Sequence, residues 1–354
     1  MARVMIIGTG DMGDRFAAGL AASGRVRELL LTDVSSELSV KAATLASSYD
    51  CIVRAESLDA RRQRDVEAVL RRAKPDLVVQ AASLQSPWAL VDRDDPVARA
   101  IAAAGLGLRL PLQLSVLLTV MRAVGEVGYQ GPVANISLPD LTHPILHMIG
   151  LAPTVGLGNV SMQLLRVRAA LRAERGPSGE LPLLRLVGHH HHVYDVMQST
   201  PPADPASGPI VWVGEQGERR DELAYKGPSI APSIRYNAVT AAAALPVLLA
   251  LLPEAEPLRW STPAPFGLAG GYPVRIANGH IDLDLPPGVE LEDCIAHCRR
   301  AGRGDGVERI DDEGTIHFTD QARASVLDVA PDIAEPLPLT ELQRRAERIL
   351  ALLG

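Results

Sequence analysis

The sequence predicts an α/β protein that begins with a doubly wound parallel sheet and continues as an α+β domain. In the first half, short apolar runs alternate with helical patterns, which is typical of such a sheet. The first apolar run leads directly into a glycine-rich turn, and the next run ends in an acidic residue. The chain has 354 residues, 47% of them hydrophobic and 22% charged. This composition is globular, and the length suits two domains.

The elements of the first half follow from the apolar runs. Aliphatic and β-branched residues predict buried strands at 3–7, 29–31, 51–53, 77–82 and 133–136. Helical patterns lie between them, most clearly at 59–73 and at about 97–125. Residues 150–153 (Gly-Leu-Ala-Pro) then break the pattern. We therefore expect a first domain at 1–150 and a second at 151–354.

A dinucleotide-binding motif opens the chain. Gly8, Gly10 and Gly13 form the pattern G-x-G-x-x-G between a strand and a helix. The first glycine allows a tight turn, the second lets the backbone approach a pyrophosphate, and the third lets the helix pack against the strand. Asp33 ends the next strand, about 20 residues on, where a carboxylate binds the ribose hydroxyls and repels a 2′-phosphate. The motif predicts a Rossmann domain that binds NAD in preference to NADP.

The same loop contains Asp11 and Met12, whose backbone we expect close to the pyrophosphate. Asp11 is unusual in this position because it adds negative charge beside a negatively charged ligand. We therefore expect its side chain to point outward.

Charge and cysteine content exclude several classes of protein. Lys and Arg total 35 against 42 Asp and Glu, a net charge of −7, which argues against a dedicated nucleic-acid binder. Three cysteines cannot form a disulfide scaffold, and the first residues lack the features of a secretion signal. The apolar stretch Ala238–Leu252 contains Pro246 and is shorter than the ~20 residues of a membrane span. We expect a cytoplasmic protein without membrane or nucleic-acid partners.

The second half predicts fewer elements. Helical patterns lie at 156–171 and 340–352, and strand patterns at 184–188 and 271–276. Four consecutive histidines, His189–His192, follow the first of these strands. We expect them to continue it as a half-exposed strand whose rings alternate between its two faces.

Further segments follow the glycine motif in a suggestive order. Ala81-Ala82-Ser83 and Asn135 end two predicted strands, Arg166-Val167-Arg168 lies on a predicted helix, and Gly188-His189-His190 comes after a third strand. Together with the glycine motif, this order resembles the lactate/malate dehydrogenase superfamily along most of the chain.

The resemblance implies roles for these residues. Ala82, Ser83 and Asn135 would lie beside the nicotinamide cofactor, Arg166 would bind the carboxylate of a small anionic substrate, and His190 would be the acid–base group. It also implies a homodimer or a homotetramer.

Two positions depart from the family pattern. The family has an aspartate that holds the catalytic histidine three residues before the carboxylate-binding arginine, where this chain has Gln163. The family loop after the fourth strand supplies an arginine that polarises the substrate carbonyl, but here that loop contains only Arg93, in unrelated surroundings. We therefore do not expect pyruvate or oxaloacetate to be the substrate.

The chemistry of hydride transfer suits the remaining residues. Imidazole has an unperturbed pKa of ~6.5, so His190 is able to exchange a proton near neutral pH. Gln163 is able to orient His190 by a hydrogen bond but not to stabilise an imidazolium as a carboxylate does. Asp195 is an alternative partner, although a strand would place it on the opposite face. Arg166 binds an anion through two parallel hydrogen bonds, and Arg235 is a second candidate for this role.

A metal site is a separate hypothesis. His143 and His147 are spaced one helical turn apart, although Pro144 lies between them, and they converge with the histidine run in the expected cleft. Such a cluster suits a divalent metal, and the NAD-dependent family 4 glycosidases, which share the fold, use one beside the cofactor. Cys294 and Cys298 are expected to be buried structural residues.

Three functions remain open on the sequence alone. The first is an NAD-dependent oxidoreductase acting on a small anionic hydroxy, keto or imino acid, with His190 as acid–base. The second is a metal-assisted, NAD-dependent enzyme that uses the histidine cluster. The third is a dinucleotide-binding protein without catalysis, favoured by Gln163 and the missing loop arginine.

Overall fold

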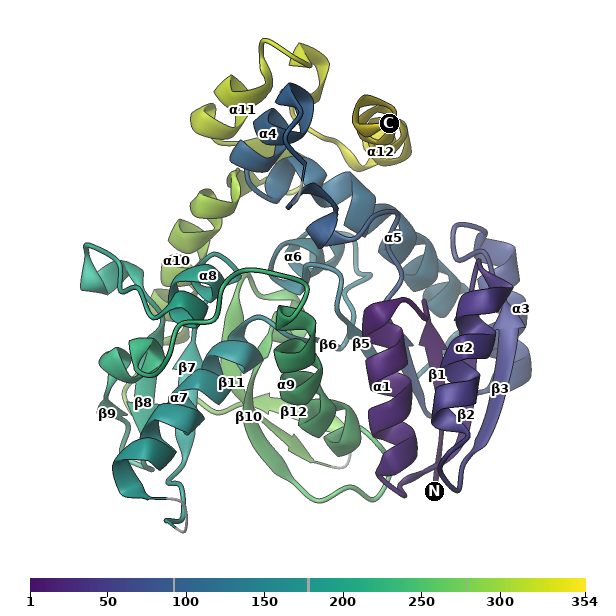
Figure 1. The fold of residues 1–354 in the computed structure, drawn as a ribbon, viewed down its shortest axis with the longest axis horizontal. Helices are drawn as coiled ribbons and strands as arrows, with labels where there is room; N and C mark the ends of the chain where they lie inside the picture. Colours follow the sequence, from purple (N-terminus) through teal and green to yellow (C-terminus); the bar gives the residue numbers. More distant parts are fainter. Residues whose placement is uncertain (92, 177–178, 278) are drawn as a thin grey trace.

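A computed structural model describes the whole chain except residues 92, 177, 178 and 278. Its first half is a six-stranded parallel sheet with the order β3-β2-β1-β4-β5-β6 (Figure 1). The strands are β1 (Ala2–Ile7), β2 (Val26–Asp33), β3 (Ile52–Ser57), β4 (Leu77–Gln80), β5 (Val133–Asn135) and β6 (Val155–Gly156). The helices between them are α1 (Asp11–Ala22), α2 (Ser36–Ala46), α3 (Gln63–Ala73), α4 (Pro96–Ala103), α5 (Leu110–Glu126) and α6 (Pro139–Met148). This confirms the predicted doubly wound domain.

Strand β1 shows why the sheet is covered on both faces. Its side chains alternate between two hydrophobic cores: Met5 and Ile7 pack with residues of α3 and α5, whereas Val4 and Ile6 pack with residues of α1 and α9 (Tyr236–Ala250). All four are at most 1% exposed. A central strand buried on both faces needs a continuous apolar run, which is the pattern seen in the sequence.

The second half contains two small three-stranded antiparallel sheets, besides the two-stranded pair of its C-terminal segment. One is β7 (Leu184–Val187), β8 (Ile210–Val213) and β9 (Glu218–Arg219), and the other is β10 (Leu258–Pro263), β11 (Gly271–Ala277) and β12 (His280–Leu283). The helices here are α7 (Val160–Arg175), α8 (His192–Gln198), α9 and α10 (Leu291–Gly302). Figure 1 shows α9 lying beside α1, so the two halves meet along these helices.

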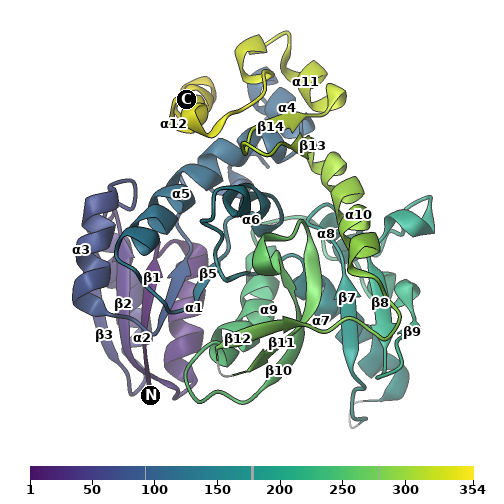
Figure 2. The same ribbon diagram turned by 180° about the vertical axis from the view of Figure 1, so that it is seen from behind.

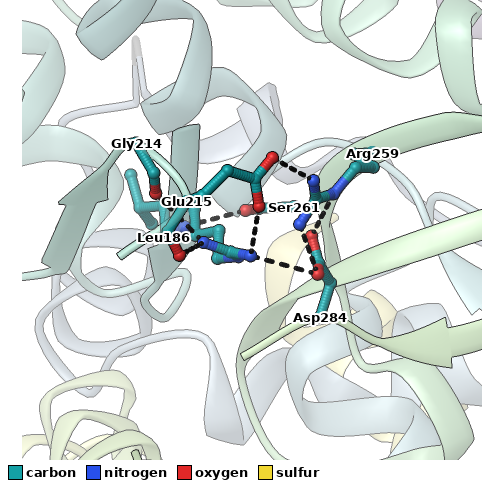
Figure 3. Close-up of polar contacts among 7 residues, drawn as sticks. Leu186, Gly214, Glu215, Arg259, Ser261 and Asp284 are labelled. Atoms are coloured by element: carbon teal, nitrogen blue, oxygen red, sulfur yellow. Dashed lines mark hydrogen bonds and ion pairs between the residues drawn. The ribbon is translucent and has the colours of Figure 1, made fainter. Parts of the chain in front are cut away.

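A charge cluster joins the two small sheets (Figure 3). Arg185 of β7 is 4% exposed, and its Nη2 donates to Asp284 Oδ1 at 3.4 Å. Arg259 of β10 donates to both carboxylate oxygens of Asp284 at 2.8 Å and to Glu215 at 2.7 Å. Burial opposes ionisation of Asp284, but the two arginines outweigh it and hold the pKa of this carboxyl below its usual range. The cluster fixes the sheet that leads to the histidine run.

The C-terminal segment returns to the first half. It contains β13 (Val307–Ile310), β14 (Ile316–Phe318), α11 (Asp320–Val326) and α12 (Leu342–Leu353). Helix α11 packs on α4 and helix α12 on α5 (Figure 2). Strand β6 lies beyond residue 150 but belongs to the parallel sheet of the first half. The division of the chain into domains at residue 150 stays a prediction.

Short 3₁₀ helices complete the chain: η1 (Pro87–Leu90), η2 (Gly107–Arg109), η3 (Pro205–Ser207), η4 (Asp221–Tyr225), η5 (Pro265–Gly267), η6 (Arg303–Asp305), η7 (Pro331–Ile333) and η8 (Leu339–Glu341). The helical pattern expected at about 97–125 is confirmed, but as two helices. It is divided into α4 and α5 at Gly105, whose φ of +82° ends the first helix. Residues 107–126 have the length and apolar composition of a membrane span. However, 78% of the most apolar 18-residue segment within them is buried inside the fold, as in the core helix of a globular protein.

Candidate active site

A cavity of about 540 Å³ lies at the carboxyl ends of the central parallel strands. Beside β1 the strand order reverses, which is where ligands bind in open α/β sheets. The cavity runs from the ends of β2 and β3, past the glycine-rich loop, to α7, α8 and α9 of the second half. It therefore has a nucleotide-motif end and a histidine end.

The glycine-rich loop has the geometry that dinucleotide binding requires. Gly8 has a φ of +91°, and a Cβ there would lie 2.5 Å from the backbone nitrogen of Ala82. A Cβ on Gly13 would lie 2.0 Å from the carbonyl oxygen of Gly8, whereas one on Gly10 would meet nothing within 4 Å. The first and third glycines thus permit close packing, and the second leaves open space beside the N-terminus of α1. These residues fit a pyrophosphate group.

Asp33 lines the cavity and also holds the loop. Its Oδ2 accepts a hydrogen bond from the backbone N–H of Thr9 at 2.7 Å, and its Oδ1 accepts one from Ser35 at 2.9 Å. Each carboxylate oxygen has a second lone pair, so the group is still able to accept ribose hydroxyls. The NAD preference stays a prediction.

Asp11 and Met12 line the cavity as well. The side chain of Asp11 is 40% exposed, as expected, but it is also bound on both sides. Its Oδ2 accepts hydrogen bonds from Arg15 at 2.9 Å and from the side-chain amide of Asn237 on α9 at 2.8 Å. The arginine balances the negative charge that made this residue unusual, and the amide connects the nucleotide loop to the second half.

Of the three strand-end residues beside the loop, two line the cavity and one does not. Ala82 and Ser83 line the cavity, as predicted for cofactor contacts. Asn135 is fully buried, and it lies outside the lining residues. Its Oδ1 accepts from the backbone N–H of Ser137 at 3.0 Å, and its Nδ2 lies 3.1 Å from His143 Nε2. Asn135 therefore shapes the turn that presents Ser137 to the cavity.

The histidine run is not a strand. After Gly188 the chain turns, and helix α8 begins at His192; the backbone N–H of His189 donates to His192 Nδ1 at 3.1 Å within this turn. The expected alternation of rings is therefore wrong, and so is the placement of Asp195 on a strand. Of the four histidines, only His190 lines the cavity.

His190 forms a dyad with Asp305, which the sequence did not indicate as its partner. The Nδ1 atom of His190 lies 3.0 Å and 3.1 Å from the two carboxylate oxygens, and both side chains are mostly buried. Burial alone lowers the pKa of His190, but the charge and hydrogen bond of Asp305 outweigh it and raise the pKa above its ordinary value. Burial raises the pKa of Asp305, but His190, together with His189, whose Nδ1 lies 3.3 Å from the same carboxylate, outweighs this effect and holds the pKa well below its usual range. The dyad thus stabilises an imidazolium.

Glycines bring Asp305 to the histidine. A Cβ on Gly105 would lie 2.6 Å from the carbonyl oxygen of Asp305, and one on Gly306 would lie 2.3 Å from that of Ala104. A Cβ on Gly304 would meet the ring of His191 at 2.3 Å. The run Gly-Arg-Gly-Asp-Gly at 302–306 was therefore the available signal, because a glycine-flanked acid marks close backbone approach.

Gln163 does not orient the ring of His190. It is fully buried, and its Nε2 donates to the backbone carbonyl of His189 at 2.9 Å. It supports the turn that carries His190, so the expected direct hydrogen bond to the ring of His190 is wrong.

Arg166 lies outside the residues that line the cavity. Its Nη2 donates to the Ser199 hydroxyl at 2.8 Å and to the carbonyl of Pro228 at 3.0 Å, so this nitrogen holds two loops together. Arg168 stacks over the ring of Trp260 at 5.1 Å. Arg166, the residue predicted to bind the substrate carboxylate, therefore does not line the cavity beside His190.

Arg109 also lies outside the lining residues, but its charge acts on His190 and Asp305. It ends η2, and its Nη1 donates to the carbonyl of Pro87, a lining residue, at 3.0 Å. Burial lowers the pKa of Arg109, while the charges of Tyr194 and Asp305 oppose the shift. Its Nε has no hydrogen-bond partner among the described residues. Arg109 was not among the expected site residues, because it lies beyond the loop after the fourth strand, where the family arginine is expected.

The predicted metal cluster does not form. His143 Nδ1 lies 3.1 Å from the carbonyl of Ala264, and burial lowers the pKa of this histidine to about 4. His147 is exposed on the same helix. In the described part of the chain, no group of three or more His, Cys, Asp or Glu side chains is placed to hold a metal ion. Cys294 and Cys298 are buried, as expected.

Comparisons with known proteins bear on the fold. No family model matches the sequence, and no curated protein matches it. The malate dehydrogenase of Archaeoglobus fulgidus in complex with NADH is similar, with a TM-score of 0.53, 14% identity, and coverage of 84% of this chain and 95% of that one. The lactate dehydrogenase MGS-M5 from a Medee basin deep-sea metagenome library has a TM-score of 0.51, 13% identity, and coverage of 86% and 97%. The malate dehydrogenase of Plasmodium falciparum has a TM-score of 0.51, 11% identity, and coverage of all of both chains.

These similarities span nearly the whole length of each chain at low identity. They agree with the order of motifs along the sequence and with the parallel sheet followed by an α+β half. The chain has the fold of the lactate and malate dehydrogenases, in a divergent sequence.

Proposed function

We propose that this protein is an NAD-dependent oxidoreductase that acts on an anionic hydroxy, keto or imino acid. The observation that carries the proposal is the His190–Asp305 dyad, which faces a cavity whose other end holds the dinucleotide motif. A protein without catalysis has no need for a buried, charge-stabilised histidine in this position, and such groups are typical of active sites.

The roles follow from the chemistry of the residues. A bound nicotinamide dinucleotide supplies or accepts the hydride. The Nδ1 atom of His190 is held by Asp305, so Nε2 is the nitrogen that exchanges a proton with the substrate oxygen or nitrogen. Asp305 keeps the ring oriented and stabilises its charged form, as an aspartate does in other histidine dyads. Arg109, whose Nη1 bonds to the carbonyl of the lining residue Pro87, is the cation that we assign to the anionic group of the substrate.

Binding and activity test the proposal together. NADH and NADPH are titrated into the pure protein by fluorescence, and the oxidation of NADH is then followed with a panel of 2-oxo acids with and without ammonium. We expect NADH binding, reduction of at least one panel member, and a loss of about 10²–10⁴-fold in kcat/KM in His190→Ala. The control is His191→Ala, because His191 is exposed and outside the cavity. Absence of dinucleotide binding, or equal activity in the two variants, would refute the proposal.

A further inference from the structure

The histidine end of the cavity is lined mainly by apolar and aromatic side chains. Trp88, Met162, Val193, Tyr194 and Tyr236 lie there with His190. Met162, Val193 and Tyr236 belong to one small hydrophobic cluster, against which Trp88 packs. The substrate therefore meets ring and aliphatic surface next to the acid–base group.

The aromatic groups are held in place by hydrogen bonds that use their polar atoms. Trp88 Nε1 donates to the side-chain oxygen of Asn237 at 2.9 Å, and the Tyr236 hydroxyl donates to the carbonyl of Ile230 at 2.7 Å. The rings of Trp88 and Tyr236 meet edge to face at 5.7 Å. Trp88 is partly exposed and presents ring surface to a ligand because its polar atom is occupied, whereas Tyr236 is only 2% exposed and supports Trp88 from behind.

Tyr194 connects this surface to the chemistry. It lies one helical turn after His190, and the two rings are 5.9 Å apart, edge to face. It is also 6.3 Å from the ring of Tyr236 and remains 36% exposed, the largest exposure among the three aromatic residues. A group attached to the carbon that reacts beside His190 reaches Tyr194 directly. A methyl group leaves most of this surface in water, whereas a phenyl or branched aliphatic group covers it.

The few charged side chains of the cavity also favour an apolar substrate side chain. Among the lining residues that the structure describes, the only Arg or Lys is Arg61, at the end near Asp33. It is bound to Asp59 through two hydrogen bonds of 2.8 Å and 2.9 Å. Arg109 lies outside the lining residues but bonds to the lining residue Pro87, so it is the one cation that we assign to a substrate carboxylate at the histidine end. A second carboxylate on the substrate would lose water without gaining an ion pair.

We infer that the substrate is a 2-oxo or 2-hydroxy acid, or the corresponding imino acid, with one carboxylate and a bulky apolar side chain, above all an aromatic one. The inference rests on the proposed function for the position of the reacting carbon, and it adds the substrate class. Trp88 and Tyr194 are the residues that determine this specificity.

Kinetics with four oxo acids test the inference. Phenylpyruvate, 4-methyl-2-oxovalerate, pyruvate and oxaloacetate are compared as substrates with NADH. We expect kcat/KM to be at least about tenfold higher for phenylpyruvate than for pyruvate, since each extra methylene in an apolar pocket contributes about tenfold or more. Oxaloacetate is expected to be the poorest of the four. A preference for pyruvate or oxaloacetate would refute the inference while leaving the proposed function intact.

A variant and a binding measurement separate the two proposals. In Trp88→Ala the ratio for phenylpyruvate over pyruvate should fall about tenfold, with little change in NADH affinity. The control is Tyr49→Ala, because this exposed tyrosine lies outside the cavity. Calorimetry with the NAD-saturated protein measures phenylpyruvate and pyruvate binding without turnover. If no oxo acid is reduced, the proposed function fails, and tighter binding of pyruvate than of phenylpyruvate refutes the inference independently.

Discussion

Replacing the dyad carboxylate by an amide, in Asp305→Asn, tests the assignment of His190 most directly. The amide keeps the shape of the side chain and its ability to accept from His190 Nδ1, but removes the negative charge that raises the pKa of the ring. Burial, the largest effect on this histidine, is then opposed only by the smaller contribution of Asp140, so the pKa of His190 falls. A hydrogen bond to a charged group contributes about 1.5–3 kcal/mol, which corresponds to a loss of about 10- to 100-fold in kcat/KM for reduction at neutral pH.

The protonation of His190 determines the direction in which the rate of reduction changes with pH. Reduction needs the imidazolium, so the wild-type rate should be high at low pH and fall as pH rises through the raised pKa of His190. In Asp305→Asn the fall should begin at lower pH. Stability follows the same logic: the charged histidine stabilises the folded state below its unfolded pKa of ~6.5, and this contribution is lost as pH rises through the folded pKa.

The measurement is kcat/KM against pH from 5 to 9, with unfolding by urea at the same pH values. A matched control is Asp311→Asn, because Asp311 bonds to His317 Nε2 at 2.9 Å in a half-buried pair outside the cavity. It should leave the activity profile unchanged. If Asp305→Asn keeps the wild-type profile, the dyad is structural and His190 is not the acid–base group.

Three further predictions concern the cofactor loop and the fold. Gly8→Ala should abolish NADH binding, because Gly8 has a φ of +91° and the new Cβ would lie 2.5 Å from backbone. The control is Gly128→Ala, which has open space around its Cβ and should keep NADH binding despite some backbone strain. Fluorescence titration with NADH checks both variants. Asp33→Ala should bring NADPH affinity up to that of NADH, and unchanged discrimination between the cofactors would show that Asp33 does not contact the ribose. Asp284→Ala should lower the free energy of unfolding by about 3 kcal/mol because it leaves the buried arginine of β7 poorly paired, whereas Asp320→Ala, in an exposed pair, should change it by less than about 1 kcal/mol in urea unfolding.

The first domain could be predicted because its determinants are local. A strand, a glycine turn and a helix follow one another within residues 2–22, where Gly8 permits close approach to the end of β4 and Gly13 permits close approach to Gly8 itself. Apolar runs without polar interruption indicated strands buried on both faces. The order of later motifs was enough to predict the dehydrogenase fold, although no single motif carried it.

The partners within the site were decided by tertiary packing. The sequence by itself determined that a histidine follows β7, but not that His190 would face the cavity or that Asp305, 115 residues further on, would hold it. Gln163 and Arg166 are on the predicted helix, yet their polar atoms bond to the backbone and loops around them. The physical reason is that periodicity and turn chemistry depend on neighbours in the chain, whereas a hydrogen bond between distant side chains depends on how whole elements pack.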